Sequence, residues 1–430
     1  MTHSNPYGST ASLRIAMLSL HSSPIGPLGT SDTGGMSVYV RELSRWLGAA
    51  GHKIDIFTCA GGAAPETRLY PNVRLIHLGH GSDIKAAREN WPEFLPDVFK
   101  VLEAYARSRH REYDIIHSHY WLSGVVGAMA QARWRRPHVT MFHTLGAVKN
   151  RTCAGEAESQ LRIAHERWLA MSADRVVVAA PREMDNLIRF SHARRTHVSV
   201  VPCGVNLELF RPADRIASRR HLEIAPDSDV VLYVGRFAPL KGLDRLIRAA
   251  GQLRSRFPKL HLLIIGGDGP QAPSSLNLIA LAAQLGLADA VRFVGRVEQQ
   301  DLPPYYSAAD LLAFPSDYES FGLVVLEALA CGIPVVATPV GAVESIIQDG
   351  VNGILIGSAD DGAVAEGIAR ILAQPPERRP GNRQIRATAE AYGWQRVAAA
   401  VGDIYESLLE AHDPAQNPPV MAPCAGGLPN

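Results

Sequence analysis

The feature that most constrains the fold is an alternation, along almost the whole chain, of short apolar runs with amphipathic helical patterns. The runs are rich in Val, Ile and Leu and are largely continuous, which is typical of strands that are buried on both faces. The helical patterns between them supply the crossover connections that parallel strands require. The sequence therefore predicts an α/β protein with doubly wound parallel sheets.

The number of apolar runs indicates two sheets rather than one. In the first half of the chain the runs lie at 13–20, 53–58, 73–78, 113–119, 138–144, 175–180 and 197–202, and in the second half at 230–235, 261–267, 291–295, 311–316, 334–339 and 353–356. Thirteen strands exceed what one strongly twisted open sheet commonly holds. We therefore expect two Rossmann-like domains that face each other across a central cleft.

The domain boundary is expected near residues 200–229, where Pro, Gly and charged residues replace the apolar rhythm. Both chain ends are polar or Pro-rich and lack periodicity, which is typical of disordered tails. The expected units are a tail over 1–11, an N-terminal domain over 12–205, a C-terminal domain over 206–392, a helix over 393–412 that crosses back to the N-terminal domain, and a tail over 413–430.

Composition and charge exclude several classes of function. The 430 residues include 43 Lys and Arg against 42 Asp and Glu, so the formal charge is +1 and no broad field favours nucleic acid or an anionic membrane. No run approaches the roughly 18 apolar residues of a membrane span, and the N-terminus lacks a secretory apolar core. The five cysteines are odd in number and share no metal-ligand spacing. We expect a cytoplasmic protein with reduced thiols.

The first candidate site is a glycine pair, Gly34-Gly35, that directly precedes a helical pattern. Ligands of open α/β sheets bind at the carboxyl ends of strands, and this pair follows the first strand. Glycines let backbone N–H groups and the helix N-terminus approach an anion closely. The alternative is a plain strand–helix turn. The spacing is not GxGxxG, so a dinucleotide fingerprint is not supported.

Three histidines, His117, His119 and His143, lie at or beside strand ends. A zinc site would need an acidic or cysteine partner at the usual spacing, and none is present. Burial with a hydrogen bond is the favoured interpretation for His117. The pair His143-Thr144 is placed where polar groups reach a substrate, and a binding role there is as well supported as a structural one.

A basic pair follows the first strand of the second half. Arg236 and Lys241 lie five residues apart on a loop with Pro239 and Gly242. Arginine binds a pyrophosphate as a fork and lysine supplies a point charge, so the pair suits a diphosphate ligand. The alternative is a solvated basic pair.

The most specific signal is the pair Glu319 and Glu327, eight residues apart around the start of a helix. Glu327 lies among apolar residues, where a carboxylate is costly without a partner, and sugar hydroxyl groups are suitable partners. Glu319 precedes the helix, so both carboxylates can face the cleft while the N–H groups of Gly322 and Leu323 point at a phosphate. Two surface carboxylates are the alternative interpretation.

With these residues the chain resembles the retaining glycosyltransferases of the GT-B fold, and within them glycosyltransferase family 4, which is marked by a Glu-x7-Glu element. The resemblance covers residues 13 to 410 and includes the segments "VVPCGVNLELFRP" and "YGWQRV". The motifs are most similar to members that move N-acetylglucosamine from UDP to inositol 3-phosphate in mycothiol synthesis. Sucrose-phosphate synthases and sucrose synthases share much of the pattern.

The resemblance implies a retaining hexosyltransferase. It would move glucose or N-acetylglucosamine from a UDP-sugar bound by the C-terminal domain to a small polar or phosphorylated acceptor bound by the N-terminal domain. Transfer to fructose 6-phosphate or fructose is one alternative, and a non-catalytic nucleotide-sugar-binding protein is another. The family pattern requires no metal or other cofactor, although it leaves room for Mg²⁺ beside the phosphates. A homodimer would be an ordinary assembly.

The resemblance also implies roles for individual residues. The residues expected to act on the reacting groups are Arg236, Lys241, Glu319 and His143. Those expected to bind the donor are Gly34, Gly35, Arg236, Lys241, Arg296, Glu319, Phe321, Gly322, Leu323 and Glu327. Those expected to line the acceptor pocket are His21, Asp32, Met36, Ser37, Lys85, Tyr120, Thr144 and Arg162.

Overall fold

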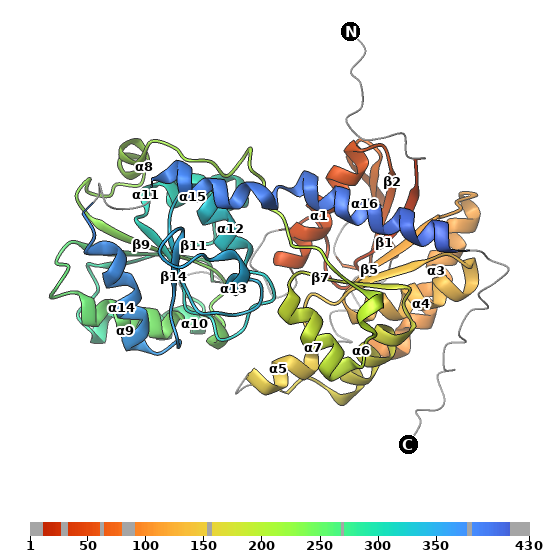
Figure 1. Ribbon diagram of the computed structural model, residues 1–430, viewed down its shortest axis with the longest axis horizontal. Helices are drawn as coiled ribbons and strands as arrows, with labels where there is room; N and C mark the ends of the chain where they lie inside the picture. Colours follow the sequence, from red (N-terminus) through yellow and green to blue (C-terminus); the bar gives the residue numbers. More distant parts are fainter. Residues whose placement is uncertain are drawn as a thin grey trace, which may run out of the picture.

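Two α/β lobes lie side by side along the long axis of the molecule (Figure 1). The computed structural model describes residues 12–26, 33–60, 64–79, 91–152, 157–267, 271–375 and 381–412. The predicted tails and two candidate acceptor residues, Asp32 and Lys85, lie outside the described residues.

The N-terminal lobe is built on an eight-stranded sheet with the order β3-β4-β2-β1-β5-β6-β7-β8. Its strands are β1 (Arg14–Leu18), β2 (Lys53–Thr58), β3 (Glu66–Tyr70), β4 (Val73–His77), β5 (Ile115–His119), β6 (His138–Met141), β7 (Arg175–Val178) and β8 (Val198–Val200). All neighbouring strands are parallel except β3 and β4. The order reverses beside β1, so the loop after β1 opens at the switch point where such sheets bind ligands.

The C-terminal lobe is built on a six-stranded parallel sheet with the order β11-β10-β9-β12-β13-β14. Its strands are β9 (Asp229–Val234), β10 (Leu260–Ile265), β11 (Val291–Gly295), β12 (Leu311–Phe314), β13 (Val335–Ala337) and β14 (Gly353–Leu355). All thirteen predicted runs contain strands, and the prediction of two doubly wound sheets is confirmed.

The antiparallel edge strand β3 is the exception to the predicted parallel order. Its sequence, ETRLY, is polar and only partly buried, so it lacks the continuous apolar run that marks the other strands. Asn72, with φ 64°, turns the chain into β4 and makes the tight hairpin. A polar outer strand also protects the sheet edge from pairing with another chain.

Helices cover both faces of each sheet (Figure 1). In the N-terminal half they are α1 (Gly35–Ala49), α3 (Trp91–Ser108), α4 (Trp121–Trp134), α5 (Gly146–Thr152), α6 (Gln160–Ser172), α7 (Pro181–Ser191) and the short η1 (Arg195–His197). In the C-terminal half they are α8 (Arg215–His221), η2 (Pro239–Lys241), α9 (Leu243–Leu253), α10 (Pro273–Gln284), η3 (Gln299–Asp301), α11 (Pro303–Ala308), α12 (Leu323–Ala330), α13 (Val343–Ile346), α14 (Asp361–Leu372), α15 (Asn382–Ala389), η5 (Glu390–Tyr392) and α16 (Trp394–Ala411).

The apolar core is divided by the two sheets. One cluster of buried residues covers a face of each sheet and continues from lobe to lobe, and each lobe has a further cluster on its opposite face. Val38, Leu43 and Leu47, which recur at helical spacing in α1, are all buried in the shared cluster. The start of α1 is therefore fixed relative to both sheets.

The helix α16 crosses from the C-terminal lobe and lies on α1 of the N-terminal lobe (Figure 1). The ring of Trp394, at its start, packs edge-on against Tyr39 with centroids 5.4 Å apart. Trp394 comes so close to Gly204 that a Cβ there would lie 2.4 Å from the indole. The Tyr405 hydroxyl hydrogen-bonds His117 Nδ1 at 2.6 Å, which links α16 to the end of β5.

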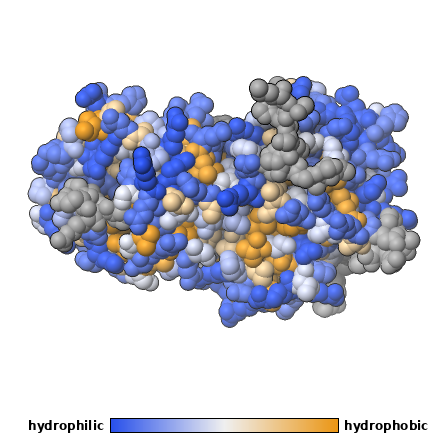
Figure 2. All heavy atoms as spheres, turned by 45° about the horizontal axis from the view of Figure 1, so that its top comes forward, coloured by the Kyte–Doolittle hydropathy of each residue, from blue (hydrophilic) through white to orange (hydrophobic). Residues whose placement is uncertain are grey.

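On the face drawn in Figure 2, hydrophilic residues predominate and the hydrophobic ones form separate small groups. Within the described parts of the chain, none of the helices combines the length and the apolar character that crossing a bilayer requires.

A buried ion pair fixes the linker between the lobes to the second sheet. Arg219 and Asp310 are both 1% exposed and lie 2.8 Å apart. The Asp310 carboxylate also accepts from Val230 N at 2.8 Å, and Arg219 donates to Ala308 O at 2.9 Å. The half-exposed Arg215 bonds the other oxygen of Asp310 at 2.5 Å.

Replacing the buried cation should destabilise the C-terminal lobe. We expect Arg219→Leu to lower its free energy of unfolding by about 3–5 kcal/mol, because the buried charge of Asp310 then loses its buried cation, while the cation of Arg215 is half-exposed. Arg215→Leu removes a cation from the same carboxylate but should cost only about 1 kcal/mol. Urea denaturation of both variants checks this, and equal losses would contradict the assignment.

Candidate active site

Two helix N-termini meet across the gap between the lobes. Gly35, the first residue of α1, is so near the start of α12 that a Cβ there would lie 3.6 Å from Leu323 Cδ1. Among the described residues, nothing lies within 4 Å of a Cβ built at Gly34, and no side chain caps either helix. The amide N–H groups of both first turns and both helix dipoles therefore favour an anion between the lobes.

The loop after β9 brings Lys241 to the same region. Gly242 has φ 66°, and a Cβ there would lie 2.2 Å from Pro315 O, so the loop packs directly on the end of β12. Lys241 Nζ donates to Glu319 Oε2 at 2.6 Å. Arg236 is exposed on the same loop, and its carbonyl accepts from the Tyr233 hydroxyl at 3.0 Å.

The Glu319 carboxylate stays ionised beside these cations. Burial raises the pKa of this carboxyl, but the charge and hydrogen bond of Lys241, the amide of Ser320 and the charge of Arg236 outweigh burial. Its pKa therefore lies below the usual value of a glutamate. A carboxylate that keeps its charge accepts hydrogen bonds from ligand hydroxyl groups.

Glu327 is placed differently from its partner in the sequence motif. Its carboxylate accepts from the Tyr306 hydroxyl at 2.7 Å and from Gln299 Nε2 at 2.9 Å. Burial dominates and raises its pKa to about 7, although both hydrogen bonds and the charge of Arg41 act in the opposite direction. Sugar hydroxyl groups were the partners expected for this buried acid, and the protein itself supplies two others, Tyr306 and Gln299.

Gln299 also connects the lobes, because Arg41 Nη2 on α1 donates to Gln299 Oε1 at 2.5 Å. Arg296 is exposed at the end of β11, three residues before Gln299. Phe321 is buried in the shared core, and Gly322 takes φ 85° just before α12. Arg296, Glu327 and the start of α12 thus all follow strands of the second sheet at its carboxyl edge.

His143 lies at the centre of a histidine group after β5 and β6. Its backbone φ of 61° is unusual for a residue other than glycine. Its carbonyl accepts a hydrogen bond from Ser320 Oγ across the gap between the lobes. Nε2 of the ring lies 3.0 Å from His119 Nδ1. Burial, reinforced by His21, lowers the pKa of His143 to about 3, so the imidazole is neutral at pH 7.

The prediction that His117 is buried and hydrogen-bonded is confirmed, since it is 0% exposed and bonded to Tyr405. Tyr39 packs edge-on against both His119 and His143, with centroids 5.6 and 5.3 Å away. Among the described residues, no group of three or more His, Cys, Asp or Glu side chains is arranged to hold a metal ion.

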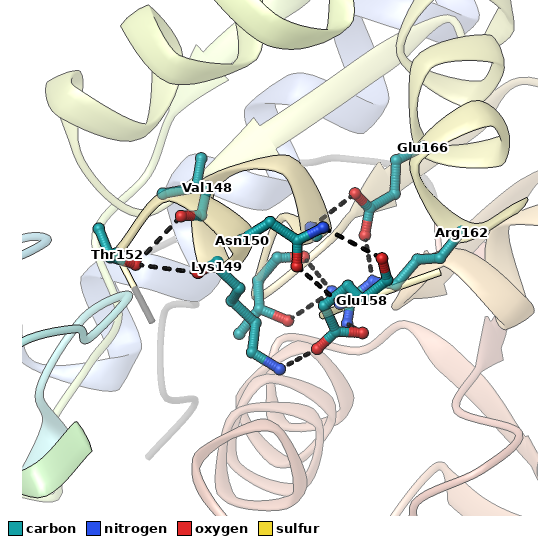
Figure 3. A network of polar contacts seen from close by, with 9 residues as sticks. Val148, Lys149, Asn150, Thr152, Glu158, Arg162 and Glu166 are labelled. Atoms are coloured by element: carbon teal, nitrogen blue, oxygen red, sulfur yellow. Dashed lines mark hydrogen bonds and ion pairs between the residues drawn. The ribbon is translucent and has the colours of Figure 1, made fainter. Parts of the chain in front are cut away.

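Three of the candidate acceptor residues form one network around Arg162, part of which Figure 3 shows. Arg162 Nη2 donates to Thr144 O at 2.9 Å and to Thr144 Oγ1 at 2.8 Å, and its guanidinium carbon lies 4.8 Å from the centre of the Tyr120 ring. Arg162 Nε donates to Glu166 Oε1 at 2.6 Å, and Nη1 lies 2.8 Å from Glu158 Oε2. The guanidinium is therefore already surrounded by protein partners.

The other described acceptor candidates lie on the same side of the cleft. The ring of His21 packs 4.2 Å from that of Tyr120. Ser37 is buried in the first turn of α1 and shares a 2.8 Å hydrogen bond with Ser22, while Met36 before it is partly buried. A cavity of about 230 Å³ opens between α5, α7 and the loop that holds Glu319, with His143 and Thr144 on its wall.

Sequence reasoning missed several residues that shape this region. Glu166 could have been found, because it follows Arg162 by four positions on one helix face. Gln299, Tyr306 and Ser320 carry no local signal, since each reaches its partner through the tertiary fold.

Comparison with known proteins identifies relatives over most of the chain. A family described as Glycosyltransferase Family 4 matches residues 33–209, and one described as Glycosyl transferases group 1 matches residues 214–388. A D-inositol 3-phosphate glycosyltransferase of Catenulispora acidiphila is 40% identical over 407 residues, covering 92% of this chain and 95% of its own. One from Streptomyces avermitilis is 39% identical over 412 residues, covering 93% and 88%.

Among solved structures, a sucrose-phosphate synthase from Thermosynechococcus elongatus superposes with a TM-score of 0.84 at 34% identity. The match covers 93% of this chain and all of that chain. The similarity therefore includes both lobes and the cleft between them.

The buried histidines predict how stability depends on pH. Burial lowers the pKa values of His117, His138 and His143 to about 3 each, whereas an unfolded histidine titrates near about 6.5. Below pH 6.5 the unfolded chain binds more protons than the folded one, so the free energy of unfolding decreases as pH falls. Each histidine contributes a loss of about 1.4 kcal/mol per pH unit. Burial raises the pKa of Glu183 to about 7, so its contribution to stability grows as pH falls and offsets the loss from one of the three histidines.

We therefore expect the unfolding temperature of the N-terminal lobe to fall between pH 7 and pH 5. The slope should be smaller in His138→Gln than in the wild type. Calorimetric scans at several pH values measure these slopes, and identical slopes in the two proteins would rule out the explanation.

Proposed function

The chain belongs to glycosyltransferase family 4, and we propose that it moves a hexosyl group, glucose or N-acetylglucosamine, from a UDP-sugar to a small polar acceptor such as inositol 3-phosphate or a sugar phosphate, with retention. The observation that carries the proposal is the Lys241–Glu319 pair in a cleft where the N-termini of α1 and α12 meet. The relatives named D-inositol 3-phosphate glycosyltransferases support the choice of acceptor.

The donor diphosphate would bind between the two helix starts. The backbone of Gly34 and Gly35 would meet one phosphate from the N-terminal lobe, while Arg236, Lys241 and the amides of Gly322 and Leu323 approach from the C-terminal lobe. Glu319 and Phe321 would lie beside the donor sugar. Arg296 would frame the base through its main chain, and Glu327 would accept hydrogen bonds from ribose hydroxyls.

The reaction would be a same-face substitution at the sugar carbon that carries the diphosphate. The bond from this carbon to the phosphate oxygen breaks while a bond to the acceptor oxygen forms. The departing phosphate oxygen takes the acceptor proton. The leaving UDP gains negative charge, which Arg236, Lys241 and the two helix dipoles stabilise without reorganisation.

His143 would lie beside the reacting carbon as a neutral group. Its low pKa keeps the imidazole uncharged at pH 7, so it would position the sugar by a hydrogen bond rather than by charge. Its placement depends on the opposite lobe, because Ser320 holds its carbonyl.

The acceptor would bind in the N-terminal lobe. His21, Met36, Ser37, Tyr120, Thr144 and Arg162 would line this pocket, together with Asp32 and Lys85. Thr144 follows His143 directly and is bonded to Arg162, so the acceptor and donor pockets would share a wall.

No metal or cofactor is part of the proposed reaction, although Mg²⁺ beside the diphosphate is compatible with it. The charge of the leaving group would be met by side chains and backbone amides. A cytoplasmic location and a homodimeric state remain predictions from the sequence.

Transfer to fructose 6-phosphate is the second candidate, and the 34% identity to a sucrose-phosphate synthase favours it. A non-catalytic nucleotide-sugar-binding protein is the alternative without chemistry. The deciding experiment combines UDP-, GDP- and ADP-sugars with inositol 3-phosphate, fructose 6-phosphate and their unphosphorylated forms, and measures nucleotide release. Release with none of the acceptors would count against the proposal.

Removing Lys241 should impair turnover far more than donor binding. We expect Lys241→Ala to lower kcat by about 10²–10³, because one preorganised charge on the leaving group is lost. The Kd for UDP should rise much less. Lys259→Ala, which removes an exposed lysine of the same lobe, serves as the control. Near-normal kcat in a folded Lys241→Ala enzyme would refute the role.

Donor binding should weaken as pH falls through 7. The pKa of Glu327 is raised to about 7, so its carboxylate form, which alone accepts hydrogen bonds at both oxygens, is lost below that pH. We expect the KM for the donor to increase from pH 8 to pH 6. In Glu327→Gln the KM should be higher and independent of pH, and a variant that keeps the wild-type pH profile would contradict this assignment.

A further inference from the structure

Two cationic side chains converge on one carboxylate beside the acceptor pocket (Figure 3). Lys149 Nζ on α5 donates to Glu158 Oε1, and Arg162 Nη1 on α6 lies 2.8 Å from Glu158 Oε2. A lysine and an arginine that share one anionic group form the arrangement that also binds a phosphate. Here the protein fills that position with its own carboxylate.

The arginine in this cluster is held on every other side. Glu166 accepts from Nε at 2.6 Å, Thr144 accepts twice from Nη2, and the guanidinium lies over the Tyr120 ring. The Arg162 side chain is only 4% exposed. Within the described part of the chain, Nη1 is therefore the guanidinium position at which a ligand anion can take the place of a protein partner, Glu158.

Of the two carboxylates in the cluster, that of Glu158 can move away from Arg162. Its side chain is 21% exposed, whereas that of Glu166 is 2% exposed. Its backbone is fixed to α5, because Asn150 Nδ2 donates to Glu158 O at 3.0 Å and Glu158 N donates to Asn150 Oδ1 at 2.6 Å. The carboxylate can thus rotate into solvent through its side-chain torsions while the backbone stays in place.

An anionic acceptor can bind at this cluster only if the Glu158 carboxylate moves away, because of the charges present. Lys149 and Arg162 balance Glu158 and Glu166, so the cluster is formally neutral. A phosphate monoester carries about −1.5 to −2 charges at pH 7 and would meet a like charge at the Glu158 carboxylate. Only when Glu158 withdraws do the two cations present a net positive site.

We propose that Glu158 is an internal counter-ion that occupies the anion site of the acceptor pocket, and that a phosphorylated acceptor binds by displacing it. This rests on the proposed function in taking the ligand to be the acceptor. A neutral polyol cannot compensate the two cations, so Glu158 stays in place and the acceptor gains nothing from them. Glu158 therefore sets how strongly a phosphorylated acceptor is preferred over its neutral form.

The direct test measures the binding of inorganic phosphate by calorimetry in the presence of UDP. Glu158→Gln keeps the size of the side chain but removes its charge and replaces one acceptor oxygen by an NH2 donor, and we expect it to bind phosphate about tenfold more tightly than the wild type. Glu103→Gln is the matched control, because it removes an acidic charge from a pair with Arg133 elsewhere in the same lobe. It should leave phosphate binding unchanged.

A second variant locates the effect within the cluster. Adding Lys149→Ala to Glu158→Gln should abolish the tighter phosphate binding, since one of the two cations is gone. Unfolding temperatures of all variants establish that they are folded. Equal phosphate affinity in the wild type and Glu158→Gln would overturn the proposal, and so would tighter binding that persists without Lys149.

Kinetics separate this proposal from the proposed function. With inositol 3-phosphate, Glu158→Gln should lower KM by about tenfold with little change in kcat, and the KM for unphosphorylated inositol should stay the same. A raised KM for the phosphorylated acceptor would mean that Glu158 only supports the cations, which overturns the proposal. If phosphate binding tightens but no phosphorylated acceptor releases UDP, the anion site stands and the proposed acceptor class is wrong.

Discussion

The ion pair between Lys241 and Glu319 is the interaction on which the rest of the site depends. It joins the loop after β9 to the segment before α12, and so places a cation and an ionised carboxylate at one edge of the second sheet. Because Lys241 keeps the pKa of Glu319 below its usual range, the carboxylate remains an acceptor of hydrogen bonds despite burial. In the proposed reaction the same lysine would neutralise the departing diphosphate, and Glu319 would position the donor sugar. One pair would then serve both charge neutralisation and sugar positioning.

Several contacts cross the cleft and join the two lobes. Ser320 donates to the carbonyl of His143, Arg41 reaches Gln299, and the start of α1 lies against Leu323. The first and third contacts join residues of the candidate pockets to the opposite lobe, and the second reaches Gln299, which bonds the candidate donor residue Glu327. A change in the separation of the lobes would therefore disturb both pockets together, which is suited to a reaction that requires donor and acceptor at once.

The sequence predicted the two sheets because buried parallel strands leave continuous apolar runs, and every such run became a strand. It missed β3, whose polar edge sequence resembles a loop. For the candidate site, position after a strand led to Gly34, His143, Arg236 and Lys241, because parallel strands bring their carboxyl ends together, and the roles of these residues stay predictions. The sequence could not identify Tyr306 and Gln299 as the partners of Glu327, because they lie on α11 and η3 and reach α12 only through the tertiary fold.

The sequence by itself determined which residue types stand at the strand ends, and therefore that glycines, cations and acids are available at the carboxyl edges of the two sheets. Only the tertiary structure decided how these groups are charged and paired. In the folded protein Glu319 pairs with Lys241, and Glu327 accepts hydrogen bonds from Tyr306 and Gln299. Glu158 lies between the cations of Arg162 and Lys149 and pairs with both. The reason is physical: charge state depends on burial and on neighbours a few ångströms away, and apart from i,i+4 pairs on one helix, such as Arg162 and Glu166, these are not encoded in spacing along the chain.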